Sequence, residues 1–285
     1  MRLPLVSSLA VVAGVAAVVA TAETPGRRIE GIRPMLIRPE VVRSWLKPVL
    51  PLVIDLYWLR TINAVGDTDS REKQRALYDY GRLITDLDPR FREVYWFVAI
   101  SLPWRLPDRT WVHVDLANDL LRRGLVQFPN DLKMNLLLGY NLITYDKAYV
   151  EAAKVFQHAA TLPNAPPFAG LIATRLYAQG GSPELGLELA KAMRDSADDE
   201  NTRAEFEARV LDLEIEALLQ QVDAAIAVHY EKLGRFPATL EEMVQAGTWT
   251  GPTTDPLGGR INIGYDNRAH AANQPRRLEL YQTDP

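Results

Sequence analysis

Prolines that close successive pairs of apolar, helix-like segments recur at a regular interval in this chain. Pro129 and Pro163 are about 34 residues apart, and an equal step leads to Ala197, where another pair ends. The interval from Pro89 to Pro129 is longer, which an insertion at residues 103–107 explains. Such a step indicates stacked helix–turn–helix units, because one helix pair cannot bury its apolar side alone. An unrelated helical bundle would have the helices but not the step.

The spacing of apolar residues between these breaks predicts a mainly α-helical fold. Apolar side chains recur three and four positions apart, which places them on one face of a helix. Residues 91–102 are apolar on almost every side, so we expect that helix to be covered on several sides. The predicted helices follow a first one that begins near Leu50, and they cover residues 71–87, 91–102, 111–128, 132–145, 149–162, 168–179 and 183–193.

Several helices carry small and large residues at the spacing of the tetratricopeptide repeat family. The matching positions are Ala117, Leu121, Gly124 and Pro129 in one second helix, Ala152, Phe156 and Ala159 in the next, and Leu138-Gly139 in a first helix. Asn135 and Leu142 stand where the family has Trp and Tyr. Residues 51–197 therefore resemble a degenerate tetratricopeptide-repeat (TPR-like) solenoid of helical hairpins, with about four units.

This resemblance implies a concave groove for a protein or peptide partner, since the first helix of each pair lines the groove in this family. It places four candidate partner-binding residues there: Lys133, Tyr140, Thr174 and Tyr177. Five of the six tryptophans precede residue 112. We interpret them as core or membrane-proximal residues, with an aromatic binding patch as the alternative.

The N-terminus has the pattern of an export signal. Arg2 precedes an apolar run, and Ala20-Thr21-Ala22 is a small-x-small cleavage site. Residues 1–22 are thus a signal peptide or an uncleaved membrane anchor, since about 20 apolar residues span a bilayer. Residues 23–50 form a linker rich in Pro and Arg, which we interpret as solvated with one short helix near residues 41–46. Contact with anionic lipid headgroups is the alternative.

Residues 198–285 have a different character and predict a small α+β module. A long helix is expected over residues 202–233, with His229 as a packed, hydrogen-bonded histidine on its apolar seam. Thr239 and Glu242 have the spacing of a capping box at the start of a short helix. Residues 260–265 alternate as a strand, and we expect residues 277–281 to return as its partner in a β-hairpin.

The order of these elements resembles the globular end of type II secretion pseudopilins. The motifs that carry the resemblance are Gly234-x-Phe236-Pro237 and Asp255-Pro256-Leu257-Gly258. The apolar N-terminal run lies far upstream of this module and lacks the prepilin peptidase signature, so we do not expect a polymerising pilin. Some members of that family bind calcium after this turn, which makes Asp266 and Asp284 weak calcium candidates. Ordinary turn capping is the alternative interpretation.

Composition excludes several kinds of chemistry. The chain has no cysteine, so disulfides, thiolate catalysis and Cys-based zinc sites are impossible. Its net charge is −4, which argues against a general nucleic-acid-binding protein. The hydrolase, zinc-protease, phosphate-loop and dinucleotide-binding motifs are missing from the sequence. We therefore expect no cofactor, no other metal site and no catalytic residues.

Together these patterns predict an exported, membrane-associated scaffold for protein–protein interactions in the bacterial cell envelope. Its location would be periplasmic, with a possible anchor in the inner membrane through residues 1–22. The first alternative is an accessory subunit of a type II secretion or type IV pilus-like machine. An envelope enzyme is the second alternative, because distant residues can assemble a catalytic set that no local motif reveals.

Overall fold

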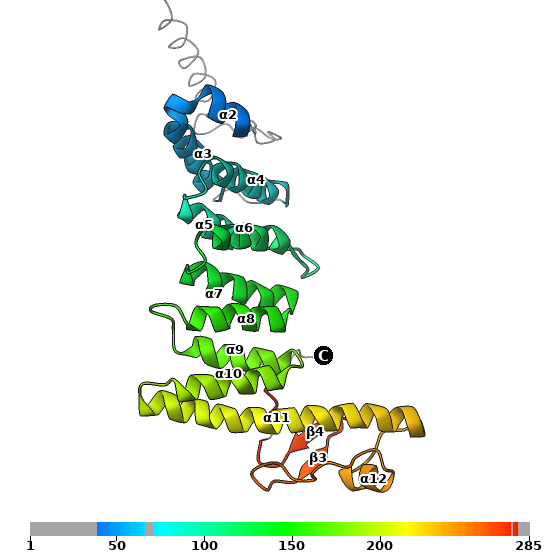
Figure 1. Cartoon of the computed structure of the whole chain (residues 1–285). Coiled ribbons are helices and arrows are strands. Elements are labelled where there is room, and N and C mark those ends of the chain that lie inside the picture. The colour runs from blue at the N-terminus through cyan, green and yellow to red at the C-terminus, as the bar shows by residue number, and fades with distance from the viewer. Residues whose placement is uncertain (1–38, 66–70, 275, 279–285) are drawn as a thin grey trace, which may run out of the picture. The chain divides into compact units, whose positions relative to one another are not determined.

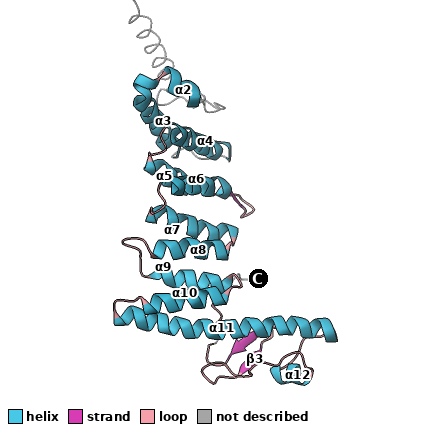
Figure 2. Ribbon diagram, viewed as in Figure 1, coloured by secondary structure: helices cyan, strands magenta, loops and turns pink. Residues whose placement is uncertain are grey.

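The computed structural model describes residues 39–65, 71–274 and 276–278, and these residues are mainly helical (Figure 2). This confirms the mainly-α class that the sequence predicts. The chain divides into two compact units, Met1–Leu137 and Leu138–Pro285. Residues 1–22 and the part of the predicted linker up to residue 38 lie outside the described residues. Within the described ranges, no helix combines the length and apolar character needed to cross a membrane.

The described part of the first unit contains helices and one short hairpin (Figure 1). Its elements are α2 (Pro39–Trp45), η1 (Lys47–Val49), α3 (Leu50–Val65), α4 (Arg71–Leu87), α5 (Arg92–Ser101), β1 (Trp104–Arg105), β2 (Trp111–Val112), α6 (Val114–Gln127) and the start of α7 (Leu132–Asn141). Helix α3 packs on α4 and α5 on α6, while α4 also packs on α5 and α6. The short helix expected in the linker is α2, which packs on α4 with Val42 fully buried.

The glycine at the family-matching position 124 allows α5, α6 and α7 to approach closely. A Cβ atom on Gly124 would lie 2.6 Å from the Met134 sulfur and 2.8 Å from Cγ of Tyr95. Both neighbours are buried, so neither has free space into which it could move. A side chain at this position would therefore push adjacent helices apart.

The Asn135 side chain organises the turn before α7. Its side-chain amide donates hydrogen bonds to the backbone carbonyls of Pro129 (3.0 Å) and Asp131 (2.9 Å). The Asp131 carboxylate accepts from the Met134 N–H at 2.9 Å and also pairs with Arg92 on α5. Polar contacts thus fix the turn that leads into α7.

The insertion that lengthens the interval between Pro89 and Pro129 is a small β-hairpin. Strand β1 pairs antiparallel with β2, with Trp104 opposite Val112, and residues 106–110 form the turn between them. The prediction of a helix from residue 111 is therefore wrong at its start, since α6 begins at Val114. The prediction failed because β1 and β2 have only two residues each, so no alternating pattern marks them as strands.

The second unit contains the end of α7 and most of the remaining chain (Figure 1). Its elements are η2 (Leu142–Asp146), α8 (Tyr149–Ala160), α9 (Phe168–Gln179), α10 (Pro183–Asp195), α11 (Glu200–Leu233), α12 (Leu240–Gln245), β3 (Ile261–Ile263) and β4 (Ala269–Ala271). Helices α8, α9, α10 and α11 pack successively, each on the next. A Cβ atom on Gly139 would lie 2.5 Å from the ring of Phe156, so the family-matching Gly and Phe meet between α7 and α8.

The long helix α11 takes part in two apolar cores. Its first half packs with α9 and α10 in a core that contains Ala178, Ala190, Phe206, Val210, Leu213 and Leu278. Its second half packs with the C-terminal module in a core that contains Ile215, Leu219, Val222, Ile226, Leu240, Met243, Trp249, Ile261, Ala269 and Ala271. One continuous helix therefore joins the helical hairpins to the module.

The C-terminal module confirms several local predictions and corrects one. Thr239 caps α12 by accepting from the Glu242 N–H at 3.2 Å, and His229 is fully buried with Nδ1 2.9 Å from Thr248 Oγ1. Strand β3 pairs with β4, whereas residues 277–281 were predicted as its partner. The reason is the tight turn at residues 264–268, where Gly264 and Arg268 are hydrogen bonded and Asn267 has a positive φ of 58°.

Candidate functional site

Four aromatic side chains of the first unit gather on its α3 and α5 helices. This aromatic cluster consists of Trp58, Phe91, Trp96 and Phe97, all half-buried. The ring centroid of Trp58 lies 5.3 Å from that of Phe91 and 5.1 Å from that of Phe97, and the Trp96 and Phe97 centroids are 6.0 Å apart. The tilted and edge-on geometries are those that aromatic rings prefer.

Lys133, a predicted site residue, lies on this cluster. Its Nζ atom is 2.9 Å from the ring centroid of Trp96, which is a cation–π contact between α7 and α5. The Lys133 side chain is otherwise exposed. The cluster is therefore an aromatic area with a positive charge on it.

Exposed aliphatic side chains continue this surface on the same two helices. Ile100 on α5 is 58% exposed, and Leu59 and Ile62 on α3 are exposed as well. In the described part of the first unit, α4 has no exposed large apolar side chain and α6 has one, Val126. The expectation that residues 91–102 are covered on several sides is confirmed, because α5 packs on α3, α4 and α6. Ile100 is an exposed exception on this helix.

The other three predicted site residues differ in how exposed they are to solvent. Tyr140 on α7 is about half exposed, with its ring edge-on to Tyr145 at 6.2 Å. Thr174 is fully buried and its hydroxyl donates to the Leu171 carbonyl at 2.8 Å. Tyr177 is 5% exposed, and its hydroxyl donates to Gln157 Oε1 at 2.7 Å.

Burial explains why Thr174 and Tyr177 do not face a partner in this structure. Helix α9, which carries both, packs on α8, α10 and α11, so three neighbours surround it. Burial also raises the pKa of the Tyr177 phenol. Of the four predicted residues, only Lys133 and Tyr140 present their side chains to solvent.

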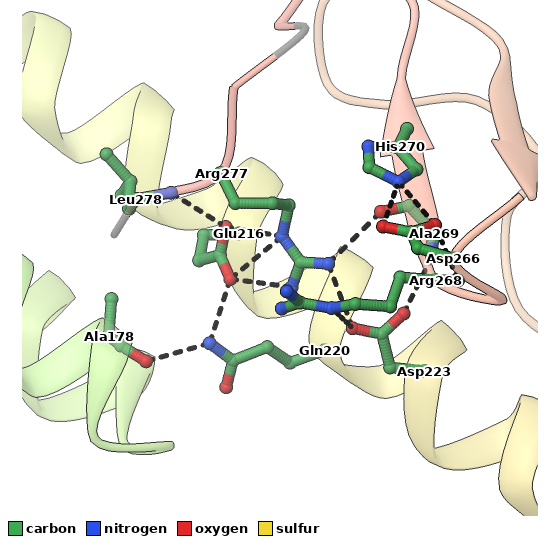
Figure 3. A network of polar contacts seen from close by, with 10 residues as sticks. All are labelled: Ala178, Glu216, Gln220, Asp223, Asp266, Arg268, Ala269, His270, Arg277 and Leu278. Atoms are coloured by element: carbon green, nitrogen blue, oxygen red, sulfur yellow. Dashed lines mark hydrogen bonds and ion pairs between the residues drawn. The ribbon is translucent and has the colours of Figure 1, made fainter. Parts of the chain in front are cut away.

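A second group of polar residues joins α11, the C-terminal segment and α9 (Figure 3). At its centre the Arg277 guanidinium donates to both carboxylate oxygens of Glu216, at 2.7–3.1 Å, and to Asp223 Oδ2 at 2.9 Å. It also donates to the Ala269 carbonyl on β4 at 3.1 Å. We call these residues, with Gln220, the polar junction.

Gln220 extends the polar junction to the helical hairpins. Its amide donates to Glu216 Oε1 at 2.9 Å and to the Ala178 carbonyl on α9 at 2.8 Å (Figure 3). Asp223 accepts in addition from the Ala269 N–H at 2.7 Å. The polar junction therefore holds three separate chain segments against one stretch of α11.

Charge pairing overcomes burial at the polar junction. Burial alone would raise the pKa of Glu216, but hydrogen bonds and attraction from Arg277 outweigh it and hold that pKa below its usual range. Burial opposes the charge of Arg277 too, and the two carboxylates raise its pKa nevertheless. Both groups are therefore charged, and their satisfied hydrogen bonds make the arrangement structural rather than catalytic.

The weak calcium candidates are not brought together in the described residues. Asp266 accepts from His270 Nε2 at 3.0 Å and from the Arg268 N–H at 3.1 Å, which is a turn-capping arrangement. Asp284 lies outside the described residues. No group of three or more His, Asp or Glu side chains able to hold a metal ion occurs in the described ranges.

The polar junction could not be recognised from sequence. Arg277 is 61 residues from Glu216 and 54 from Asp223, so no local spacing relates them. The sequence offers one signal for this group: the charged residue Glu216 lies between the apolar residues Ile215 and Leu219 of the helix.

Comparison with protein-family models finds no match to this chain, and comparisons with curated proteins and with solved structures find no significant similarity.

Proposed function

We propose that this protein is an exported, membrane-associated scaffold that binds a protein partner in the bacterial cell envelope. The observation that carries the proposal is the surface made by the aromatic cluster, Lys133 and Ile100. It combines half-buried aromatic rings, an exposed aliphatic side chain and one cation. Tryptophan, which supplies the rings of Trp58 and Trp96, is among the residues in which binding hot spots are enriched.

The location of this surface supports a repeat-type binding mode. It lies on α3 and α5, each the first helix of its pair, and the second helices α4 and α6 carry few exposed apolar side chains in their described residues. In a TPR-like solenoid the first helices line the partner groove. We therefore keep the TPR-like assignment, and Lys133 and Tyr140, as part of the proposal.

Site-specific photo-crosslinking tests this function. A benzophenone amino acid is placed at Ile100 on the proposed surface or at Val126 on α6, which is exposed on a different helix. We expect a discrete adduct from position 100 in living cells and none from position 126. Adding Trp96→Ala should abolish the adduct while circular dichroism stays unchanged. Equal adducts from both positions would refute the assignment.

A specific observation also supports the alternative, an accessory subunit of a type II secretion or pilus-like machine. In the pseudopilin-like module, the Tyr230 and Phe236 rings stack at 4.5 Å and both are exposed, as are Leu257 and Tyr265 at turns. These side chains could dock on machine components. Substituting Leu257→Ser and Tyr265→Ser should then block secretion without unfolding the protein, and normal secretion would exclude this alternative.

A further inference from the structure

Two arginines of the second unit lie close together on neighbouring helices without a matching set of acceptors. Arg175 is on α9 and Arg209 on α11, and these helices pack against each other. The Nε atom of each side chain is buried and has no hydrogen-bond acceptor. A buried donor without an acceptor costs about 1–3 kcal/mol, so such a position suggests a missing partner.

Other arginines in the protein show how this pair differs. Arg82 and Arg123 also have a buried Nε without an acceptor, but Arg82 Nη1 donates to the Tyr78 hydroxyl at 2.8 Å and Arg123 Nη2 pairs with Asp86. Arg175 makes no hydrogen bond or ion pair with any described residue. Arg209 has only a long ion pair, with Nη1 3.6 Å from Asp212 Oδ2.

The local charges do not balance. Two guanidinium groups share one carboxylate, Asp212, whose side chain is 41% exposed. Burial, and then repulsion from Arg175, hold the pKa of Arg209 below its usual range despite the attraction of Asp212. One positive charge therefore remains uncompensated at a partly buried position, where charge pairing is stronger than in water.

We propose that Arg175 and Arg209 bind a carboxylate from an acidic segment of the partner protein. This inference rests on the proposed scaffold function and names the chemistry of the partner. A guanidinium presents two parallel N–H donors that fit a carboxylate. A single carboxylate would neutralise the remaining positive charge, whereas a phosphate dianion would leave an excess of negative charge at the site.

A binding titration with defined probes tests the site. The full-length protein is titrated with fluorescein-labelled hexaglutamate, and labelled hexaglutamine serves as the uncharged control. We expect hexaglutamate to bind at least about tenfold more tightly than hexaglutamine. The double variant Arg175→Gln, Arg209→Gln should lose at least about tenfold in hexaglutamate affinity, the loss of about 1.4 kcal/mol expected for a charged pair.

The matched control is Arg203→Gln, which removes the same charge from α11 at an exposed side chain that pairs with Glu200. Its affinity for hexaglutamate should equal that of the wild type. If Arg203→Gln weakens binding as much as the double variant, the attraction is general and the site is refuted. Competition by inorganic phosphate as strong as by glutarate, a small dicarboxylate, would refute the carboxylate assignment.

Three further outcomes distinguish which segment occupies the arginine site and which of the two proposals fails. If the full-length variant Glu279→Gln, Asp284→Asn binds hexaglutamate about tenfold more tightly, the occupant belongs to the chain itself and the partner assignment is overturned. If the crosslink from position 100 persists but Arg175→Gln and Arg209→Gln change nothing, the arginine site alone fails. If no crosslink forms from position 100 in cells whose protein keeps both arginines, the scaffold function is refuted instead.

Discussion

Arg277 and Glu216 form a buried ion pair across 61 residues of chain, with side chains that are 6% and 4% exposed. Three hydrogen bonds connect the two groups, and each also bonds to other segments. The last described residues of the chain are thereby held on α11 together with β4 and the end of α9. The C-terminal module and the helical hairpins consequently share one polar contact as well as one helix.

Removing one member of this pair should strongly destabilise the protein. In Glu216→Gln the Arg277 charge stays buried without its main partner, and we expect a loss of about 3–5 kcal/mol in unfolding free energy. Urea denaturation followed by circular dichroism measures it. The control is Glu214→Gln, a partly exposed residue on α11 paired with Lys191, for which about 0.2–1 kcal/mol is expected. Equal losses in both variants would contradict the role assigned to the junction.

The same pair predicts a loss of stability in acid. The folded-state pKa of Glu216 lies below its ordinary value of 4.5, so the pair stabilises the fold fully above that pH. As pH falls below 4.5 and through the lowered folded-state pKa, the folded protein must take up a proton and the contribution disappears. Thermal unfolding at pH values below 4.5 should show a steeper decline in wild type than in Glu216→Gln. Parallel curves for the two proteins would argue against it.

Gly124→Ala should destabilise the first unit through overpacking. The added Cβ would lie 2.6 Å from the Met134 sulfur, and we expect a cost of about 1–3 kcal/mol in unfolding free energy. Chemical denaturation measures this change. Val126→Ala on the same helix changes an exposed side chain and should stay within about 0.5 kcal/mol. A neutral Gly124→Ala would mean that α6 and α7 can separate without cost.

Thr248→Val should destabilise the C-terminal module by about 1–3 kcal/mol in unfolding free energy. The Thr248 hydroxyl donates to the Met243 carbonyl at 3.2 Å and lies 2.9 Å from Nδ1 of the buried His229. Valine removes this hydroxyl and leaves a buried ring nitrogen without its partner. Thr254→Val, at an exposed residue of the same module, is the control. Thermal melts that coincide for both variants would show that His229 does not depend on this bond.

Export is tested by fusing alkaline phosphatase after residue 38, since this enzyme is active only outside the bacterial cytoplasm. We expect phosphatase activity from the fusion and none after deletion of residues 1–22, because those residues have the charged start, apolar run and small-residue cleavage site of an export signal. The size of the exported fusion distinguishes a cleaved signal from an uncleaved anchor. Activity that survives the deletion would contradict the export prediction.

Most helices could be predicted from sequence because their signals are local. Helices α4 and α9 cover the predicted ranges 71–87 and 168–179, and α11 ends at Leu233 with Gly234 at a positive φ of 71°. The partner of β3 could not be predicted in the same way. The sequence patterns of residues 269–271 and 277–281 did not distinguish which segment pairs with β3. The tight turn after β3 brings β4 beside it, and this turn decides the pairing.

The candidate site was predictable only in part. The resemblance to a repeat family selected Lys133 and Tyr140, and both are exposed. The same resemblance selected Thr174 and Tyr177, which are buried, because helix periodicity shows which residues share a face but not how many neighbours cover it. The contact of Lys133 with Trp96 joins separate helices and has no local signal.

The helical content, the spacing of the helix pairs and the character of the C-terminal module all follow from local patterns in the sequence, because periodicity, prolines and capping residues act over a few positions. Which charges are buried together, and which apolar side chains remain uncovered, depends instead on how the folded chain packs. Those outcomes rest on contacts between residues such as Arg277 and Glu216, which are far apart in the chain and whose pairing balances a large desolvation cost against an equally large attraction.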